Sequence, residues 1–380
     1  MGCAAAAGWW PSVGHWPAAR PDFLFRMQAL KRKVSLADLA QQLQLSPSTV
    51  SRALAGQKDI SQTTQARVRQ LAEQLSYLPN GLAASLRRGR SRTLGLVVPH
   101  LNGGFYPAVV TSVERAASAA GYHVVMCQSH EDVCREQRSI STLLAAQVDG
   151  IILSVSTTTQ AETHHLEQVR QQGTPMVFFN RVPDLPQTKA VVLDDFSGAY
   201  QAVTHLIEKG CERIAHLAGH QHLTPNRNRY LGYQQALRAH GLPAPPEWVY
   251  ALAAPSLAEG RAGMRHLLAL APAPDAVFSV GAYPAAGALE VAQAAGLRVP
   301  HDLALACVSD EPFTSLQQLN LTTVNQRAEP MGEAAVRLLL QALEHGPGYH
   351  PPHVVLAPEL CVRASSLRAA RPEAAAGPAP

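Results

Sequence analysis

Apolar residues near the beginning of the chain recur at helical spacing in two short segments separated by a break. Leu36, Leu39 and Ala40 follow the i, i+3, i+4 pattern of one helix face. The pattern is then interrupted, and Ser46 followed by Pro47 is typical of the start of a second helix. Serine caps a helix well, and the missing N–H of proline costs nothing at the first helical position. The pattern therefore predicts two short helices joined by a tight turn.

The second of these helices is expected to have an apolar face and a polar face. Val50, Ala53 and Leu54 form the apolar face, whereas small polar side chains and one arginine occupy the other positions. In a helix-turn-helix the second helix enters the major groove of DNA and offers such side chains to base edges. Arginine is the side chain best suited to guanine. An ordinary helical hairpin in a globular core is the competing interpretation.

A third helix and a basic segment follow. Ser61 is a good cap, and apolar residues recur at helical spacing between residues 68 and 75, so this helix would close a three-helix core. The stretch 80–86 is too short to hold a helix alone, and it leads into the arginine-rich segment 87–92. This stretch either folds on binding DNA or is a flexible basic linker.

From residue 93 onward, short apolar runs alternate with helical segments, which predicts an α/β fold with parallel sheets and helices on both faces. Roughly nine strands over about 230 residues indicate two Rossmann-like lobes, with a ligand in the cleft between them. The predicted strands are 94–98, 123–127, 148–153, 175–179, 190–193, 214–217, 248–251, 276–280 and 303–308.

Charge is distributed unevenly along the chain. The whole sequence has 32 Lys and Arg, 28 Asp and Glu, and a net charge of +4. Residues 20–92 contain thirteen of the basic and four of the acidic residues, so the remainder is mildly acidic. This asymmetry indicates a nucleic-acid-binding head on an acidic body, with an affinity that depends on salt.

Several other classes of protein find no support. The six cysteines form no C-x-x-C pair, which fits a reducing cytoplasm rather than a disulfide framework. No run approaches the ~20 apolar residues of a membrane helix. Dinucleotide, P-loop and nucleophile-elbow motifs are absent, and His164 and His165 lack a third metal ligand at useful spacing. We therefore expect no cofactor, no metal, no membrane association and no enzymatic activity.

Several motifs, taken together, resemble the LacI/GalR family of bacterial transcriptional regulators from about residue 34 to residue 363. They are LADLA and SPSTVSRAL in the head, YLPNGLAASL as a hinge, LGLVVP as the first body strand, and VDGIIL, HLIEKGCERIAHL, GLRVPHDLAL and LTTVNQ further along. The resemblance implies an all-α helix-turn-helix head and two lobes of the periplasmic-binding-protein type. It also implies a homodimer that binds a palindromic operator in double-stranded DNA and is controlled by a small carbohydrate effector.

This organisation predicts the following division of the chain. Residues 1–30 form a disordered or mis-assigned extension, 31–79 the head, 80–92 a hinge helix or linker, 93–367 the body and 368–380 a disordered tail. One lobe takes about 93–192 with 323–350, and the other 193–322 with 351–367.

The resemblance also implies which residues contact DNA. They are Pro47, Ser48, Thr49, Ser51, Arg52, Asn80, Leu86 and Arg87. By position, Pro47, Ser48 and Arg52 face base edges. Thr49 and Ser51, on the same helix, contact phosphates or take part in helix packing. Leu86 occupies the place of a leucine that family members wedge into the minor groove at a central CG step, with Arg87 following it. Packing within the linker is the alternative for Leu86.

The effector residues implied by the resemblance are Phe105, Asn180, Arg181, Arg227, Arg229, Tyr283 and Asp310. Aspartate and arginine suit sugar hydroxyls, and arginine would also suit a phosphate. Bracing of the cleft by Arg229 and capping of the next segment by Asp310 are the alternatives. Many family members carry an Asn-Asp pair where this chain has Gly281 and Ala282. Either the effector is less hydroxylated there, Tyr283 substitutes, or effector binding is weakened.

The sequence therefore predicts a sequence-specific DNA-binding transcriptional repressor under allosteric control by a small effector. Induction and corepression are both compatible with it. A sugar-binding protein, or an enzyme on a Rossmann-like body, without a role at DNA is the alternative.

Overall fold

The structure is a computed structural model that describes residues 34–77, 90–159, 163–186, 188–346, 349 and 353–368 of the 380-residue chain. It consists of two compact units that divide at residue 87, a small head and a larger body, and each is considered by itself. The predicted extension at 1–30, most of the hinge and nearly all of the tail lie outside the described residues.

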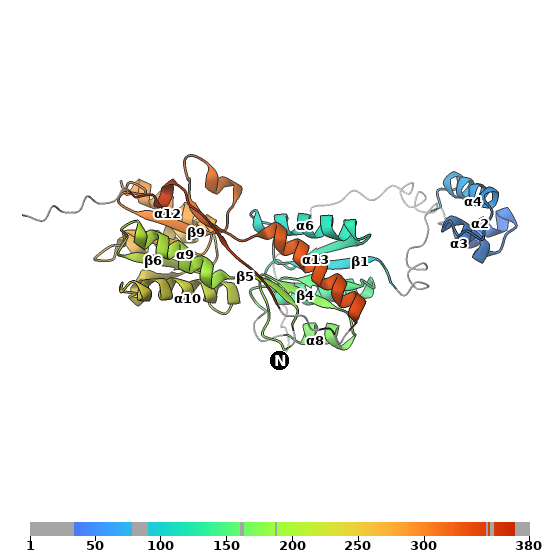
Figure 1. Ribbon diagram of the computed structural model, residues 1–380, viewed down its shortest axis with the longest axis horizontal. Helices are drawn as coiled ribbons and strands as arrows, with labels where there is room; N and C mark the ends of the chain where they lie inside the picture. The colour runs from blue at the N-terminus through green and yellow to red at the C-terminus, as the bar shows by residue number, and fades with distance from the viewer. Residues whose placement is uncertain are drawn as a thin grey trace, which may run out of the picture. The chain divides into compact units, whose positions relative to one another are not determined.

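The head contains the three predicted helices, α2 (Leu36–Leu43), α3 (Pro47–Leu54) and α4 (Gln62–Gln74) (Figure 1). Each helix begins at a serine whose side chain accepts a backbone hydrogen bond from the first turn. Between α2 and α3, Gln44 adopts a left-handed conformation with φ 55°, which ends α2 and turns the chain. The buried core of the head is Leu39, Ala40, Val50, Ala53, Val68 and Ala72.

The body contains two six-stranded sheets with helices on both faces, as predicted. The first sheet has the order β11-β5-β4-β3-β1-β2, and the second β12-β10-β9-β8-β6-β7. The first sheet's strands are β1 (Thr93–Val98), β2 (His123–Gln128), β3 (Gly150–Leu153), β4 (Met176–Phe179), β5 (Ala190–Leu193) and β11 (Val354–Leu356). The second sheet's are β6 (Ile214–Ala218), β7 (Val249–Ala251), β8 (Ala276–Ser279), β9 (Ala304–Val308), β10 (Thr322–Asn325) and β12 (Glu359–Cys361).

Each sheet is buried between two pairs of helices. In the first lobe, α6 (Phe105–Ala119) and α13 (Ala328–His345) cover one face, and α7 (Val133–Ala145) and α8 (His164–Gln171) cover the other. In the second lobe, α11 (Leu257–Leu268) and α12 (Ala282–Ala294) lie opposite α9 (Asp195–Glu208) and α10 (Thr224–Ala239). The strands are apolar on both sides because both sides are covered. Short 3-10 helices lie at Pro246–Trp248, Pro312–Ser315 and Ala364–Ser366.

The last part of the body differs from the prediction. Strands β10, β11 and β12 were not predicted from the sequence. Strand β12 runs antiparallel to β10, so the second sheet is mixed. Strand β10 pairs with β9 in the second lobe, and β11 pairs with β5 in the first, which is the reverse of the predicted assignment of these two segments. Strands β11 and β12 are three-residue strands at sheet edges, and β10 lies inside the second sheet but has a single apolar residue, so none of them shows a clear pattern.

No helix among the described residues is both long and apolar enough to cross a membrane.

One histidine is buried in the second lobe without a charged partner. His216 of β6 is fully buried, and its ring stacks on Phe278 and Tyr233 at centroid distances of 5.1 Å each. Its Nδ1 donates to the Phe278 carbonyl oxygen at 2.9 Å, whereas Nε2 has no partner in the described structure. Burial of the imidazole lowers its pKa from 6.5 to about 4, so the ring is neutral at pH 7.

We expect His216 to make the body less stable in mild acid. Below pH 6.5 the unfolded chain binds a proton at this residue, and the folded chain does so only near pH 4. The free energy of unfolding should therefore fall by about 3 kcal/mol across this window. In urea unfolding at pH 7 and pH 4.5, His216→Phe should weaken the pH dependence, and exposed His301→Gln should keep that of the wild type. An equal pH dependence in H216F and wild type would contradict this assignment.

Candidate functional site

Helix α3 presents the predicted DNA-contacting residues of the head on one side. Pro47, Ser48 and Arg52 are exposed, whereas Thr49 and Ser51 are half-buried beside the core. The three residues predicted to face base edges are thus the more exposed ones, and their contacts with DNA stay a prediction. The other predicted contacts, Asn80, Leu86 and Arg87, lie outside the described residues.

Hydroxyl groups surround the N-terminus of α3. The Ser46 Oγ accepts a hydrogen bond from the Thr49 N–H at 3.1 Å and lies 2.7 Å from the Ser48 Oγ. The Thr49 Oγ1 is 2.8 Å from the same Ser46 oxygen. The positive end of the helix dipole and these exposed hydroxyls suit a phosphate or a base edge.

The arginine predicted to contact a base, Arg52, has a carboxylate partner that the sequence did not indicate. Arg52 forms an ion pair with Asp59, which lies between α3 and α4, and both side chains are about half exposed. Exposed ion pairs contribute little to stability, so this pair can be broken at small cost.

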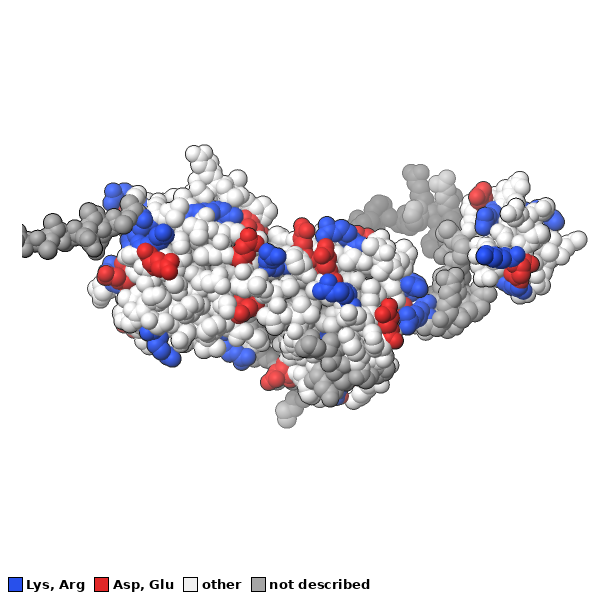
Figure 2. Space-filling view, in the orientation of Figure 1, with Lys and Arg blue, Asp and Glu red and all other residues white. Residues whose placement is uncertain are grey.

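The basic excess of the head lies mainly outside its three-helix core. Between residues 34 and 77 there are four Lys and Arg and three Asp and Glu. Both signs are interspersed on the faces of the head and the body that Figure 2 shows. The predicted positive charge of this part of the chain therefore belongs mostly to the segments on either side of the core.

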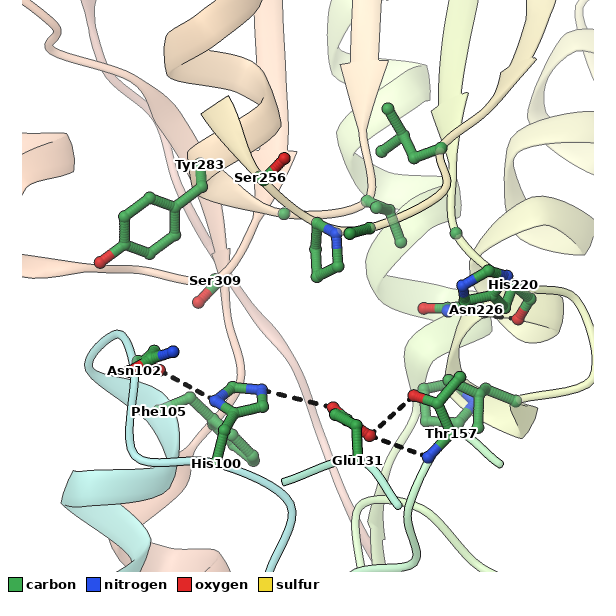
Figure 3. Close-up of a pocket in the computed structure, with 18 of the residues that line it drawn as sticks. His100, Asn102, Phe105, Glu131, Thr157, His220, Asn226, Ser256, Tyr283 and Ser309 are labelled. Atoms are coloured by element: carbon green, nitrogen blue, oxygen red, sulfur yellow. Dashed lines mark hydrogen bonds and ion pairs between the residues drawn. The ribbon is translucent and has the colours of Figure 1, made fainter. Parts of the chain in front are cut away.

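A cavity of about 660 Å³ lies between the two lobes of the body. Its lining follows the carboxyl ends of strands in both sheets, where ligands bind in parallel α/β folds. In the first lobe the lining segments come directly after β1, β2, β3 and β4, and in the second lobe after β6, β7, β8, β9 and β10. Figure 3 shows the side chains of the two walls facing each other across the cavity.

The first-lobe wall is polar and is organised by Glu131. This carboxylate accepts hydrogen bonds from Arg181 at 2.7 Å and from the N–H and hydroxyl of Thr157 at 2.8 and 2.7 Å. Burial acts to raise the pKa of Glu131, but Arg181 and the hydrogen bonds outweigh it, so the pKa is lowered overall. His100 lies 3.7 Å away along the row seen in Figure 3, and burial lowers its pKa.

The base of this wall is fixed by a buried hydrogen-bonded row. Asn180 has a φ of 57°, and its side-chain amide donates to the Tyr106 hydroxyl at 3.2 Å. That hydroxyl lies 3.1 Å from the Ser154 Oγ. The Phe105 ring packs edge-on against Tyr106 and lines the cavity beside it. The structure therefore brings Phe105, Asn180 and Arg181 to one wall.

The second-lobe wall contains Arg229, whose charge is already neutralised. Its Nε and NH2 lie 2.7 Å from one carboxylate oxygen of Asp195, and its NH1 donates to the Val280 carbonyl at 3.1 Å. Both side chains are buried. Burial acts to raise the pKa of Asp195 against the attraction of Arg229. Arg229 thus lines the cavity and also braces it, which was the alternative left open by the sequence.

The position of the missing Asn-Asp pair lies on this second wall. Gly281 and Ala282 both line the cavity and carry no polar side-chain group. Tyr283 follows them, is half-buried, and leans on Phe313 at a centroid distance of 4.9 Å. Its ring and hydroxyl point toward the first-lobe wall in Figure 3. Tyr283 is therefore placed where it can substitute for one of the absent polar groups.

Two predicted effector residues do not line the cavity. Arg227 is exposed because, near the start of α10, Pro225, Asn226 and Arg229 occupy the face that borders the cavity. Asp310 points away from the cavity and pairs with Arg363 at 2.7 Å. The cavity lining therefore gives no support to the prediction that these two side chains meet an effector, and Asp310 ties the C-terminal segment to the second sheet.

Sequence reasoning missed Glu131, Ser309 and Glu311, all of which line the cavity. Ser309 and Glu311 flank Asp310, so the strand end was identified, but the sequence did not show which of its side chains face the cavity. Each of the three follows the carboxyl end of a strand, and that position was the available signal.

Two hydrogen bonds cross directly from one lobe to the other at the cavity. The Gly104 N–H, at the start of α6, donates to the Glu311 carboxylate. The His222 Nε2 donates to the Thr157 carbonyl oxygen at 2.9 Å. These contacts hold the lobes in the arrangement seen here. Within the described residues, no group of three or more His, Cys, Asp or Glu is placed to hold a metal ion.

Comparisons with known proteins match both units. The model for bacterial regulatory proteins of the lacI family matches residues 35–80, and the model for the periplasmic binding protein-like domain matches residues 203–366. The ribose operon repressor of Halalkalibacterium halodurans is 30% identical over 313 residues, covering 82% of this chain and 91% of that protein. The transcriptional repressor CytR of Escherichia coli is 31% identical over 320 residues, with coverages of 84% and 93%.

Solved structures agree with this result. The transcriptional regulator CelR in complex with cellobiose is 30% identical, with a TM-score of 0.67, over 87% of this chain and 99% of that one. The lac repressor dimer bound to operator and the anti-inducer ONPF has a TM-score of 0.78 at 24% identity, over 88% and 100%. At that identity the similarity to the lac repressor supports the fold alone.

A helix-turn-helix head and a two-lobed body with a ligand-sized cavity define a DNA-binding transcriptional regulator with an effector domain. The relatives at 30 and 31% identity cover more than four fifths of the chain. The chain belongs to the lacI family of bacterial regulatory proteins. The family resemblance of its sequence motifs is thereby confirmed.

The Arg229–Asp195 pair generates a stability prediction. Arg229→Gln leaves a buried carboxylate without its cation and should lower the free energy of unfolding by about 3–5 kcal/mol at pH 7. The double substitution Arg229→Gln/Asp195→Asn removes both charges and should recover part of the loss. Arg261→Gln, which breaks the exposed pair with Glu290, is the control and should leave stability almost unchanged. Urea unfolding measures all four proteins, and a double variant no more stable than R229Q would disprove the charge-pair explanation.

Proposed function

We propose that this protein is a repressor that binds a palindromic operator as a homodimer and changes its DNA affinity when a small carbohydrate-type effector enters the cavity of the body. One observation carries the proposal. A head with an exposed polar recognition helix and a body with a cavity between two lobes occur in one chain. The ribose and cellobiose in the names of two similar proteins favour a polyhydroxylated effector. The protein would act in the cytoplasm, where its DNA target lies.

The proposed DNA contacts begin with α3. Exposed Pro47, Ser48 and Arg52 would meet base edges, with Arg52 donating to a guanine after leaving Asp59. Thr49 and Ser51 would contact phosphates or support the helix. Contacts by Asn80, Leu86 and Arg87 remain part of the proposal on the basis of the family resemblance alone.

In the body, we assign effector contacts to Phe105, Asn180, Arg181 and Tyr283. Aromatic rings can cover the apolar face of a sugar, and amide and guanidinium groups can bond its hydroxyls. Arg229 would orient the wall through Asp195 and Val280 rather than supply a free charge. We infer that the cavity binds its ligand without transforming it, as expected of a regulator rather than an enzyme.

The two lobes provide the element that couples effector to DNA. An effector that contacts both walls binds one degree of lobe closure better than another and so shifts the population toward it. A coupling free energy of ~1–3 kcal/mol is typical of such systems. Either sign of response is compatible with this arrangement, because the sign depends on which closure state orders the heads on DNA.

Operator selection tests the DNA-binding part of the proposal. Selection from a random duplex library with the full-length protein at about 0.15 M salt should enrich a palindrome with a central CG step. Arg52→Ala should reduce affinity for the selected site by roughly tenfold or more, because a guanine contact is worth about 1–3 kcal/mol. Asp59→Asn is the matched control, since it frees Arg52 and should retain binding. Equal binding by R52A and wild type would exclude this role for Arg52.

The edge strand β2 supports the proposed homodimer. Val125 and Met126 are adjacent, point to opposite faces of the first sheet, and are each 41% exposed at an unpaired sheet edge. Exposed apolar residues on an open edge favour association with another chain. We therefore place a dimer contact at β2.

Substitution at this edge tests the dimer contact. Val125→Asp should shift the protein from dimer to monomer in sedimentation velocity, because a carboxylate in an apolar interface is costly to desolvate. Val355→Asp is the control, because Val355 is 59% exposed on β11 at the opposite edge of the same sheet. Dissociation by V355D but not by V125D would move the interface to the other edge.

A further inference from the structure

The charges around the cavity are almost all committed to partners within the protein. Arg181 is paired with Glu131 at 2.7 Å, and Arg229 is paired with Asp195 at 2.7 Å. No lysine lines the cavity among the described residues. Of the carboxylates at the cavity, Glu311 alone has no ion pair with a cation in the part of the chain that the structure describes. With buried Asp195 behind Arg229 included, the two arginines are accompanied by three carboxylates, and the site has an excess of negative charge.

Glu311 lies where an anionic ligand would otherwise be most favoured. It follows β9 in the second lobe, and its carboxylate accepts from the Gly104 N–H at the N-terminus of α6 in the first lobe. The Ser309 hydroxyl donates to its other oxygen at 3.0 Å, and the residue is only 7% exposed. Helix α6 has no capping side chain of its own, so Glu311 supplies the negative charge at its positive end.

The loop before α6 is shaped to receive this carboxylate. A Cβ atom at Gly104 would lie 2.8 Å from the Glu311 Oε2, and one at Gly103 would lie 3.1 Å from Oε1. Gly103 also has a φ of 82°, a conformation that L side chains rarely adopt. Two consecutive glycines thus allow Glu311 to reach the helix end, and a larger residue at 104 would displace it.

We propose that Glu311 is a specificity-determining residue that excludes phosphorylated and other anionic effectors from the cavity. This inference rests on the proposed function, because it names the effector class of the same cavity. A phosphate entering here would meet the Glu311 carboxylate at the α6 N-terminus. Neither arginine can offset this repulsion without leaving its own carboxylate unpaired, which is most costly for Asp195 because that side chain is only 4% exposed.

The two walls further describe the ligand. The first-lobe wall offers amide, hydroxyl and imidazole groups. The second-lobe wall is mostly apolar, with Leu223, Pro225, Leu252, Ala253, Pro255, Val280, Ala282 and Pro284. A ligand that fits both walls has hydroxyl groups on one side and an apolar face on the other, as a neutral sugar ring or glycoside has. The sequence had left open that the arginines bind a phosphate group of the effector, and this alternative is therefore disfavoured.

Inorganic phosphate is the probe that tests Glu311 directly. The unfolding temperature of the full-length protein is measured in sodium phosphate and in sodium chloride of equal ionic strength, without DNA. We expect no phosphate-specific rise for the wild type. Glu311→Ala frees the α6 N-terminus and should bind phosphate about tenfold more tightly or better, giving a saturable rise. Glu311→Gln keeps a hydrogen-bond acceptor for Gly104 without the charge and should give an intermediate response.

Controls separate this result from general effects on stability. Glu344→Ala removes an exposed carboxylate on α13 and should behave as the wild type does. Each Glu311 variant in sodium phosphate is compared with the same variant in sodium chloride, so a lower unfolding temperature caused by the substitution itself does not affect the result. The proposal is overturned if the wild type shows the phosphate-specific rise, or if folded E311A and E311Q show none.

Ribose and ribose 5-phosphate provide the second arm, because they share one carbon skeleton and only the second carries a phosphate. If ribose 5-phosphate stabilises the wild type, the proposal is overturned, whatever the result with inorganic phosphate. If ribose 5-phosphate stabilises E311A and not the wild type, the proposal is supported. Neither arm uses an operator. Failure of the repressor assignment would therefore be seen in the DNA selection, whereas failure of the inference about Glu311 would be seen in the phosphate comparison.

Discussion

The effector site depends on the parallel direction of the strands in both sheets. Strands that run in one direction end at one edge, so the residues that follow them come together however far apart they lie in the sequence. The cavity is lined in this way from nine strand ends, five of them in the second lobe. Only β12 runs against this direction, and the cavity lining does not include it. The sheets thus supply a rigid base, and the connecting segments supply the chemistry.

Paired charges then determine what this edge can bind. A guanidinium taken out of water needs a carboxylate, and Glu131 and Asp195 provide one for each cavity arginine. The pairing leaves Arg181 and Arg229 able to donate hydrogen bonds, but the carboxylates cancel most of the electric field of the two guanidinium groups. It also fixes their direction, because each arginine donates further to a backbone carbonyl, that of Val155 or Val280. The walls are therefore suited to orienting neutral polar groups.

The sequence predicted those features that depend on local chemistry. Ser46 and Pro47 marked the start of α3 because capping is decided within one turn, and contiguous apolar runs marked the buried strands. Strands β10 to β12 were missed because β10 has a single apolar residue, Val324, and β11 and β12 have only three residues each. The directions of Arg227, Asp310 and Glu311 could not be read because their surroundings are set by the fold. Asp310 turns toward Arg363, and Glu311 reaches Gly104, 207 residues away in sequence.

The contact that sets the charge of the cavity is also a contact between the lobes. Glu311 belongs to the second lobe and Gly104 to the first, so their hydrogen bond is present only while the lobes are close at this edge. A ligand that approached the α6 N-terminus with its own negative charge would compete with this bond and favour a more open state. A neutral ligand can leave the bond intact and add contacts to both walls. Rejection of anions and stabilisation of the closed arrangement therefore follow from one carboxylate, so ligand choice and lobe closure are physically linked.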